Sequence, residues 1–135
     1  MPSKNISIID PADVPVITMR DGRIESQRLV TSKRDGSERM SFHVNRIKAG
    51  NRSKDVVYPG MDEINYMIEG EATIGYDGKR ERITEGMVWN IPAGCAYDFD
   101  NDVDIVIISV FLCMRSIVRS IAQRTRVFFV AWARC

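Results

Sequence analysis

Short segments with alternating apolar and polar residues, separated by turns, run through most of the chain. In residues 40–48 the alternation would put Phe42 and Val44 on one face and His43, Asn45 and Ile47 on the other. Turn residues such as Asp77-Gly78 recur at roughly 8–12-residue intervals. This pattern predicts seven or more short strands without a convincing helix among them, which is typical of an all-β sandwich or barrel.

The remaining strands follow from the same alternation and from the Gly, Pro and Asp residues that interrupt it. They are expected at residues 24–32, 56–58, 63–74 with an interruption at Gly70, 80–84, 87–91 and 103–111, with a possible edge strand at 14–17. At 135 residues the chain is expected to form one domain. We divide it into an N-terminal extension or edge strand (1–20), a barrel (21–111) and a basic, apolar C-terminal tail (112–135).

Charge separates the tail from the rest of the chain. Residues 1–111 carry 14 Lys and Arg against 18 Asp and Glu, whereas residues 112–135 carry five Arg and no acid. An acidic body argues against a nucleic-acid groove. The longest uncharged apolar run, residues 105–114, is too short to span a membrane. The tail itself predicts a short amphipathic helix followed by a strand-like segment at 127–132, and three interpretations stay open: packing on the barrel or on a second subunit, a non-native sequence, or membrane-surface binding.

Cysteine and histidine usage limits the chemistry. The three cysteines, Cys95, Cys113 and Cys135, show no C-x-x-C spacing, which argues against a zinc knuckle or a disulfide framework. No secretory signal opens the sequence, and a reducing cytoplasm is the expected location. His43 is the only histidine, so a metal site with two or three histidines is excluded. We therefore expect neither a metal nor another cofactor.

Two stretches carry a more specific pattern, in residues 50–70 and 86–101. The positions that fit it are Gly50, Val56, Tyr58, Glu63 and Gly70, then Gly86, Pro92, Gly94, Tyr97 and Asn101. Their spacing resembles the paired motifs of the cupin superfamily, and the three histidine positions of those motifs hold Val56, Tyr58 and Tyr97. The resemblance implies a single-domain, cupin-like β-barrel of the jelly-roll type.

Residues 25–111 resemble ectoine synthase, a small dimeric cupin, most clearly in the segments 25–30, 41–50 and 69–74. The resemblance implies a homodimer. In that family a glutamate, a tyrosine and a histidine hold a catalytic iron, and these positions are here Glu63, Trp89 and Tyr97. The family's substrate-lining arginine and tyrosine match Arg28 and Tyr58, while its asparagine-x-threonine pair is replaced by His43 and Asn45.

Alternation and the resemblance together predict which side chains would line the barrel. These are His43, Asn45, Glu63, Asn65, Met67, Trp89, Ile91, Tyr97 and Phe99, with Tyr58 and Arg28 at the mouth. A carboxyl buried among apolar side chains has a raised pKa, which would prepare Glu63 as a general base. Tyr58, Tyr97 or His43 would serve as acid or oxyanion donor, and Arg28 would grip a substrate carboxylate. Asn45, Asn65, Trp89 and Phe99 complete the expected substrate-binding set.

The sequence leaves the function between two classes. One is a metal-independent lyase or cyclase that uses acid–base chemistry on a small polar or carboxylate substrate. The other is a non-catalytic ligand-binding or sensory cupin. A purely structural role for Glu63 also stays open, in which it is a remnant hydrogen-bonded to Tyr58 and Tyr97 in a satisfied polar network. A residual metal site formed by Glu63, Tyr97 and His43 is an alternative to the metal-free pocket that we expect.

Overall fold

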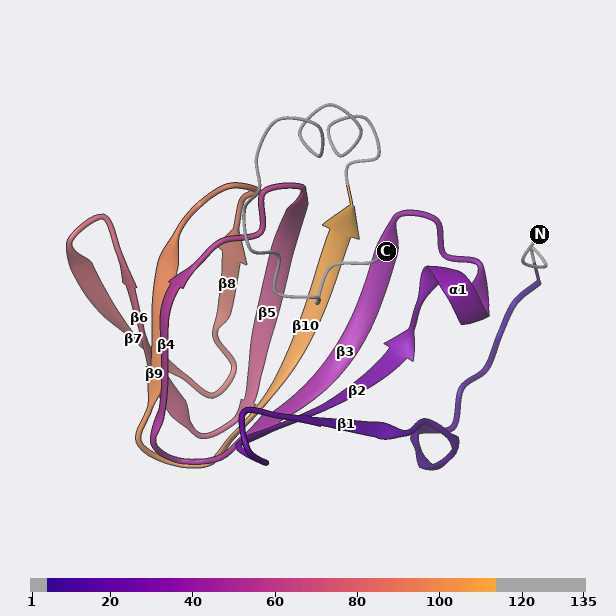
Figure 1. Cartoon of the computed structure of the whole chain (residues 1–135), viewed down its shortest axis with the longest axis horizontal. Helices are drawn as coiled ribbons and strands as arrows, with labels where there is room; N and C mark the ends of the chain where they lie inside the picture. Colours follow the sequence, from indigo (N-terminus) through magenta and orange to yellow (C-terminus); the bar gives the residue numbers. More distant parts are fainter. Residues whose placement is uncertain (1–4, 114–135) are drawn as a thin grey trace.

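The computed structural model describes residues 5–113 and consists of two antiparallel sheets that face each other (Figure 1). The strands are β1 Val16–Met19, β2 Ile24–Val30, β3 Met40–Ile47, β4 Asn51–Val56, β5 Met61–Glu69, β6 Glu71–Tyr76, β7 Lys79–Thr84, β8 Val88–Ile91, β9 Tyr97–Asn101 and β10 Ile105–Cys113. The six-stranded sheet has the order β1-β2-β3-β10-β5-β8 and the four-stranded sheet the order β4-β9-β6-β7. A 3₁₀ turn, η1 Pro11–Asp13, and a single helical turn, α1 Ser32–Asp35, complete the description.

Most of the expected strands are present, and β3 has the expected faces, with His43, Asn45 and Ile47 buried. The predicted interruption at Gly70 separates β5 from β6. Gly70 has a φ of 86°, and a Cβ atom there would lie 2.5 Å from the Asp104 carbonyl oxygen. A side chain at this position would therefore be strained and would clash with the backbone.

Two local expectations were wrong. The strand expected at residues 56–58 is β4, which runs from Asn51 to Val56, so that Tyr58 lies in the following loop. Its inward side chains are polar, since Asn51 and Ser53 are buried and Asn51 Nδ2 donates to the Phe99 carbonyl oxygen at 3.3 Å. The strand expected at residues 24–32 ends at Val30, because α1 follows, and the first turn of α1 is capped by the Thr31 hydroxyl accepting from Arg34 N–H.

The inward side chains change from apolar to polar along the larger sheet. Ile105 lies opposite Ile47, and Ile107 lies opposite Met67; these residues belong to the buried apolar core. Further along β10, Ser109 lies opposite His43 on one side and Asn65 on the other. The apolar cluster therefore fills one end of the space between the sheets, and polar side chains fill the other.

The outer face of the six-stranded sheet carries exposed apolar side chains, including Ile64, Tyr66 and Ile68 on β5 and Val88 on β8. The homodimer implied by the resemblance stays a prediction, and we place its interface on this face because its exposed apolar side chains would be buried there. We expect a dimer mass in sedimentation equilibrium, and a monomer mass for Tyr66→Lys because the charge would be desolvated. Lys79→Glu, on the other sheet, should stay dimeric; a monomeric wild-type chain would contradict the prediction.

Among residues 5–113 the structure contains no helix long and apolar enough to cross a membrane. The helix and strand expected in the tail lie outside the described residues. The cytoplasmic location stays a prediction.

Candidate functional site in the barrel interior

Five polar side chains from three adjacent strands share the interior of the larger sheet. They come from the inward positions of β3, β5 and β10 and are all buried: His43, Asn45, Glu63, Asn65 and Ser109. The strand order β3-β10-β5 brings them together, because β10 lies between the other two strands. Sequence alternation anticipated the inward position of four of them, but not that of Ser109.

Hydrogen bonds join four of these side chains, those of Asn45, Ser109, Asn65 and Glu63, into one chain that ends at Glu63. Asn45 Nδ2 donates to Ser109 Oγ at 3.0 Å, and Ser109 Oγ donates to Asn65 Oδ1 at 2.6 Å. Since Asn65 uses its oxygen for Ser109, it presents its Nδ2 to Glu63 Oε1, at 3.1 Å. The second carboxyl oxygen, Oε2, accepts from the Tyr97 hydroxyl at 3.1 Å. Both oxygens of Glu63 are thus held by fixed donors.

Burial has the largest effect on the pKa of Glu63. It raises the pKa of Glu63, and the hydrogen bonds from Asn65 and Tyr97 only partly oppose this effect. Burial, followed by the Glu63 charge, raises the pKa of Tyr58 to about 12 and also raises the pKa of Tyr97. At neutral pH both tyrosines are therefore protonated hydrogen-bond donors beside a carboxyl group of increased basicity.

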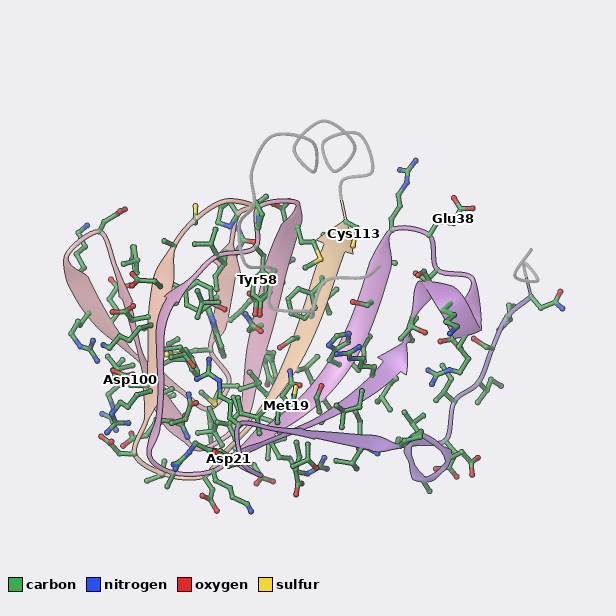
Figure 2. All side chains as sticks on the ribbon, viewed as in Figure 1. Met19, Asp21, Glu38, Tyr58, Asp100 and Cys113 are labelled. Carbon is green, nitrogen blue, oxygen red and sulfur yellow. The ribbon has the colours of Figure 1, made fainter. Side chains whose placement is uncertain are left out.

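His43 and Tyr58 both pack against the aromatic ring of Phe111. The Phe111 ring centroid lies 5.1 Å from that of His43 and 5.5 Å from that of Tyr58 (Figure 2 labels Tyr58, between the sheets). Burial, and then the nearby charge of Arg28, lowers the pKa of His43 to about 4. His43 is consequently neutral at pH 7. Arg28, half-buried on β2, lies opposite His43 in the strand register.

Two of the expected substrate-binding aromatics pack with the apolar core. The Trp89 and Phe99 rings are stacked, with centroids 5.8 Å apart and an interplanar angle of 14°. Phe99 is buried within the apolar cluster, and Trp89 packs against that cluster. These rings shape the apolar side of the interior, whereas Asn45 and Asn65 belong to the hydrogen-bonded chain.

No family model matches the chain, and no curated protein does either. Solved structures match it well. Ectoine synthase from P. lautus has a TM-score of 0.70 at 22% identity, covering 80% of this chain and 78% of that one. KdgF from Halomonas sp. has a TM-score of 0.68 at 14% identity, covering 81% and 96%. The polyketide cyclase RemF from Streptomyces resistomycificus has a TM-score of 0.68 at 18% identity, covering 82% and 81%.

The chain has the cupin fold, which it shares with a cupin superfamily protein from Desulfitobacterium hafniense and a RmlC-like cupin from Shewanella frigidimarina. The all-β jelly-roll prediction is thereby confirmed.

The cupin interior does not fit the iron site that the ectoine synthase resemblance implies. Of the three positions, Trp89 offers only an N–H donor and no lone pair for a metal. The Tyr97 hydroxyl donates a hydrogen bond to Glu63, and burial raises the pKa of Tyr97. The phenolate that a metal needs is therefore disfavoured. In residues 5–113 no three His, Cys, Asp or Glu side chains lie close enough together to hold an ion. We therefore derive no chemistry through a metal.

The poor fit to an iron site predicts a low metal content for the purified protein. Protein prepared without chelator should contain far less than one transition-metal ion per chain, because within residues 5–113 Glu63 is the only buried carboxylate. Elemental analysis after dialysis measures this directly. Stoichiometric iron, zinc, nickel or manganese that survives dialysis would contradict the expectation.

Ser109 is a member of the hydrogen-bonded chain that was not predicted from the sequence, and a lone polar residue at an inward position of the apolar β10 was the available clue. Ser109→Ala should lower the free energy of unfolding by about 1–3 kcal/mol, because Asn65 Oδ1 and Asn45 Nδ2 both lose a buried partner. Ser26→Ala is the matched control. The Ser26 hydroxyl is also buried and has no partner within residues 5–113, so its removal should be neutral or stabilising. Equal losses in urea unfolding would show that the chain of bonds contributes nothing.

Proposed function

We propose that this chain is a small-molecule-binding cupin in which Glu63 performs acid–base chemistry on a small polar or carboxylate substrate. The reaction type is a metal-independent, ectoine-synthase-like lyase or cyclase. The observation that carries the proposal is the state of Glu63. Its carboxyl is buried, each oxygen accepts a hydrogen bond from a side chain held in place, and its pKa is raised.

A carboxyl in this environment suits a general base. Desolvation makes the carboxylate more basic, so its pKa moves towards the working pH, where proton transfer is most effective. Asn65 fixes the position of one oxygen and Tyr97 the other, so the base does not need to reorganise before reaction. The proton would move from a substrate N–H, O–H or C–H to a Glu63 oxygen, and Glu63 would later return it.

The hydrogen-bond donors around Glu63 suit the negative charge that develops on the substrate when Glu63 takes its proton. Tyr58 keeps its proton at neutral pH and can donate a hydrogen bond to a substrate oxygen that becomes negative. Neutral His43 can donate or accept. Arg28 supplies a planar cation from β2 for a substrate carboxylate. That an ectoine synthase and a polyketide cyclase are among the similar structures supports a cyclase or lyase.

The rival function is ligand binding without turnover. The hydrogen-bonded chain from Asn45 to Glu63 favours it, because a buried polar network can be purely structural. An ectoine synthase assay and a panel of small carboxylic acids would separate the two. Turnover by the wild type that is lost in Glu63→Gln supports the enzyme, whereas saturable binding with no turnover of any compound supports the binding protein.

A further inference from the structure

We propose that Arg20 and Tyr58 form a subsite for the carboxylate group of the ligand at the mouth of the barrel. This inference rests on the proposed function, because it assigns one end of the molecule that Glu63 would act on. It names a substrate class: small carboxylic acids whose acid group lies apart from the atom that exchanges a proton with Glu63. The role proposed above for Arg28 on β2 is separate, and the Arg20 subsite is an additional position for an acid group.

Arg20 lies in the turn between β1 and β2 of the larger sheet, and its side chain contacts the smaller sheet. Arg20 and Asp21 have φ angles of 51° and 55°, in the left-handed region that residues other than Gly adopt at a cost. The guanidinium Nη1 donates to Ser53 Oγ at 3.0 Å and to Asn51 Oδ1 at 3.4 Å. Figure 1 shows the end of β1 reaching towards β4, the strand to which Asn51 and Ser53 belong.

The two anchoring side chains are themselves buried. Asn51 is 1% exposed and Ser53 is 8% exposed, and Asn51 Nδ2 donates to Ser53 Oγ at 3.2 Å. A fixed pair of acceptors on β4 therefore holds one nitrogen of Arg20. A long side chain at a turn would otherwise sample many rotamers, and this attachment lowers the entropy that binding would cost.

The charge of Arg20 is not neutralised by a carboxylate of the described chain. Within residues 5–113 only its Nη1 has hydrogen-bond partners, so Nε and Nη2 remain as donors. The arginines around the hollow on the outer face of the smaller sheet behave differently. There Arg80 pairs with Asp100 at 2.8 Å, and Arg52 and Arg82 are also ion-paired, so that hollow offers no free cation.

The field of Arg20 reaches the polar interior. Its positive charge lowers the pKa values of Tyr58 and Tyr97, against the larger effects of burial and of Glu63. A ligand carboxylate near Arg20 would thus meet a cation and the protonated Tyr58 hydroxyl together. The planar guanidinium suits a carboxylate through two parallel N–H donors.

Binding of succinate, followed by isothermal titration calorimetry at low ionic strength, tests the subsite. We expect saturable binding to the wild type and at least about tenfold weaker binding to Arg20→Gln. Arg20→Lys should recover part of the affinity, since it restores the charge but not the fork. The control is Arg23→Gln, which removes the same charge from a nearby exposed arginine that only bonds the Ala49 carbonyl oxygen. The control should bind as the wild type does.

Other outcomes would overturn the subsite. These are no succinate binding to the wild type, equal weakening in Arg20→Gln and Arg23→Gln, or tighter binding of inorganic phosphate than of succinate. Ser53→Ala gives a second test in which the charge is kept and only its anchor is lost, and we expect weaker binding there too. Glu63→Gln should bind succinate normally while losing turnover. The binding results can therefore contradict the Arg20 subsite without affecting the proposed role of Glu63. The turnover results can likewise contradict the role of Glu63 without affecting the subsite.

Discussion

Glu63→Gln should lower turnover by about two to four orders of magnitude while the protein keeps its fold and its ligand affinity. Glutamine cannot accept a substrate proton at neutral pH, so the base is lost. Its hydrogen bonds can be kept. The glutamine oxygen can accept from Asn65 Nδ2, and the glutamine nitrogen can donate to the Tyr97 oxygen after the hydroxyl rotates. The substitution therefore separates chemistry from structure.

Steady-state kinetics, calorimetric binding and thermal unfolding of three variants measure this effect. Glu69→Gln is the matched control, because Glu69 lies at the exposed end of the same strand, and it should behave as the wild type does. Glu63→Leu should be destabilised, since Asn65 Nδ2 and the Tyr97 hydroxyl each lose a buried acceptor, at about 1–3 kcal/mol apiece. Stabilisation by leucine with unchanged ligand binding would instead identify Glu63 as a structural remnant.

The free energy of unfolding should fall as the pH is lowered from about 6.5 to about 4, and His43 is the expected cause. Its folded-state pKa is about 4, against an ordinary value of 6.5, so the unfolded chain takes up the proton first. The native state is thus favoured above pH 6.5 and loses up to roughly 3 kcal/mol across this window. Asp35 and Asp98 have lowered pKa values, so their contributions are lost mainly below the ordinary value of 3.8.

Glu63 acts with the opposite sign in the same pH range. Its folded-state pKa is raised, so the native state binds the proton more readily and gains stability as the pH falls from that pKa towards the ordinary value of 4.5. Urea unfolding at several pH values separates the two groups. His43→Gln should flatten the acid loss, and Glu63→Gln should make it steeper. An unchanged slope in His43→Gln would show that another group is responsible.

Alternation was sufficient to predict which residues of β3 and β5 face inward. A period of two places His43 with Asn45 and Glu63 with Asn65 whatever the neighbouring strands are. The partners of these side chains depend on strand order, which local alternation does not specify. Ser109 joins Asn45 to Asn65 because β10 lies between β3 and β5, a pairing of segments more than 40 residues apart in the chain.

Sequence alternation was less informative where the structure departs from period-two apolar patterns. β4 was placed too late because its inward residues, Asn51 and Ser53, are polar. Arg20 was missed because its position depends on two non-glycine residues with positive φ in a segment with little periodicity. Its partners on β4 are more than 30 residues away in sequence, so the contact follows from the tertiary fold and not from a local motif.

The titration of the Glu63 carboxyl tests the account most directly, and it needs no substrate. Protein labelled with ¹³C at the glutamate side-chain carboxyl can be followed by NMR across the acid-to-neutral range, with Glu63→Gln identifying the resonance by its loss. We predict that this one carboxyl titrates clearly above its ordinary value of 4.5, because burial outweighs the hydrogen bonds from Asn65 and Tyr97. Titration at or below 4.5 would contradict the prediction and leave the general-base role of Glu63 without its physical basis.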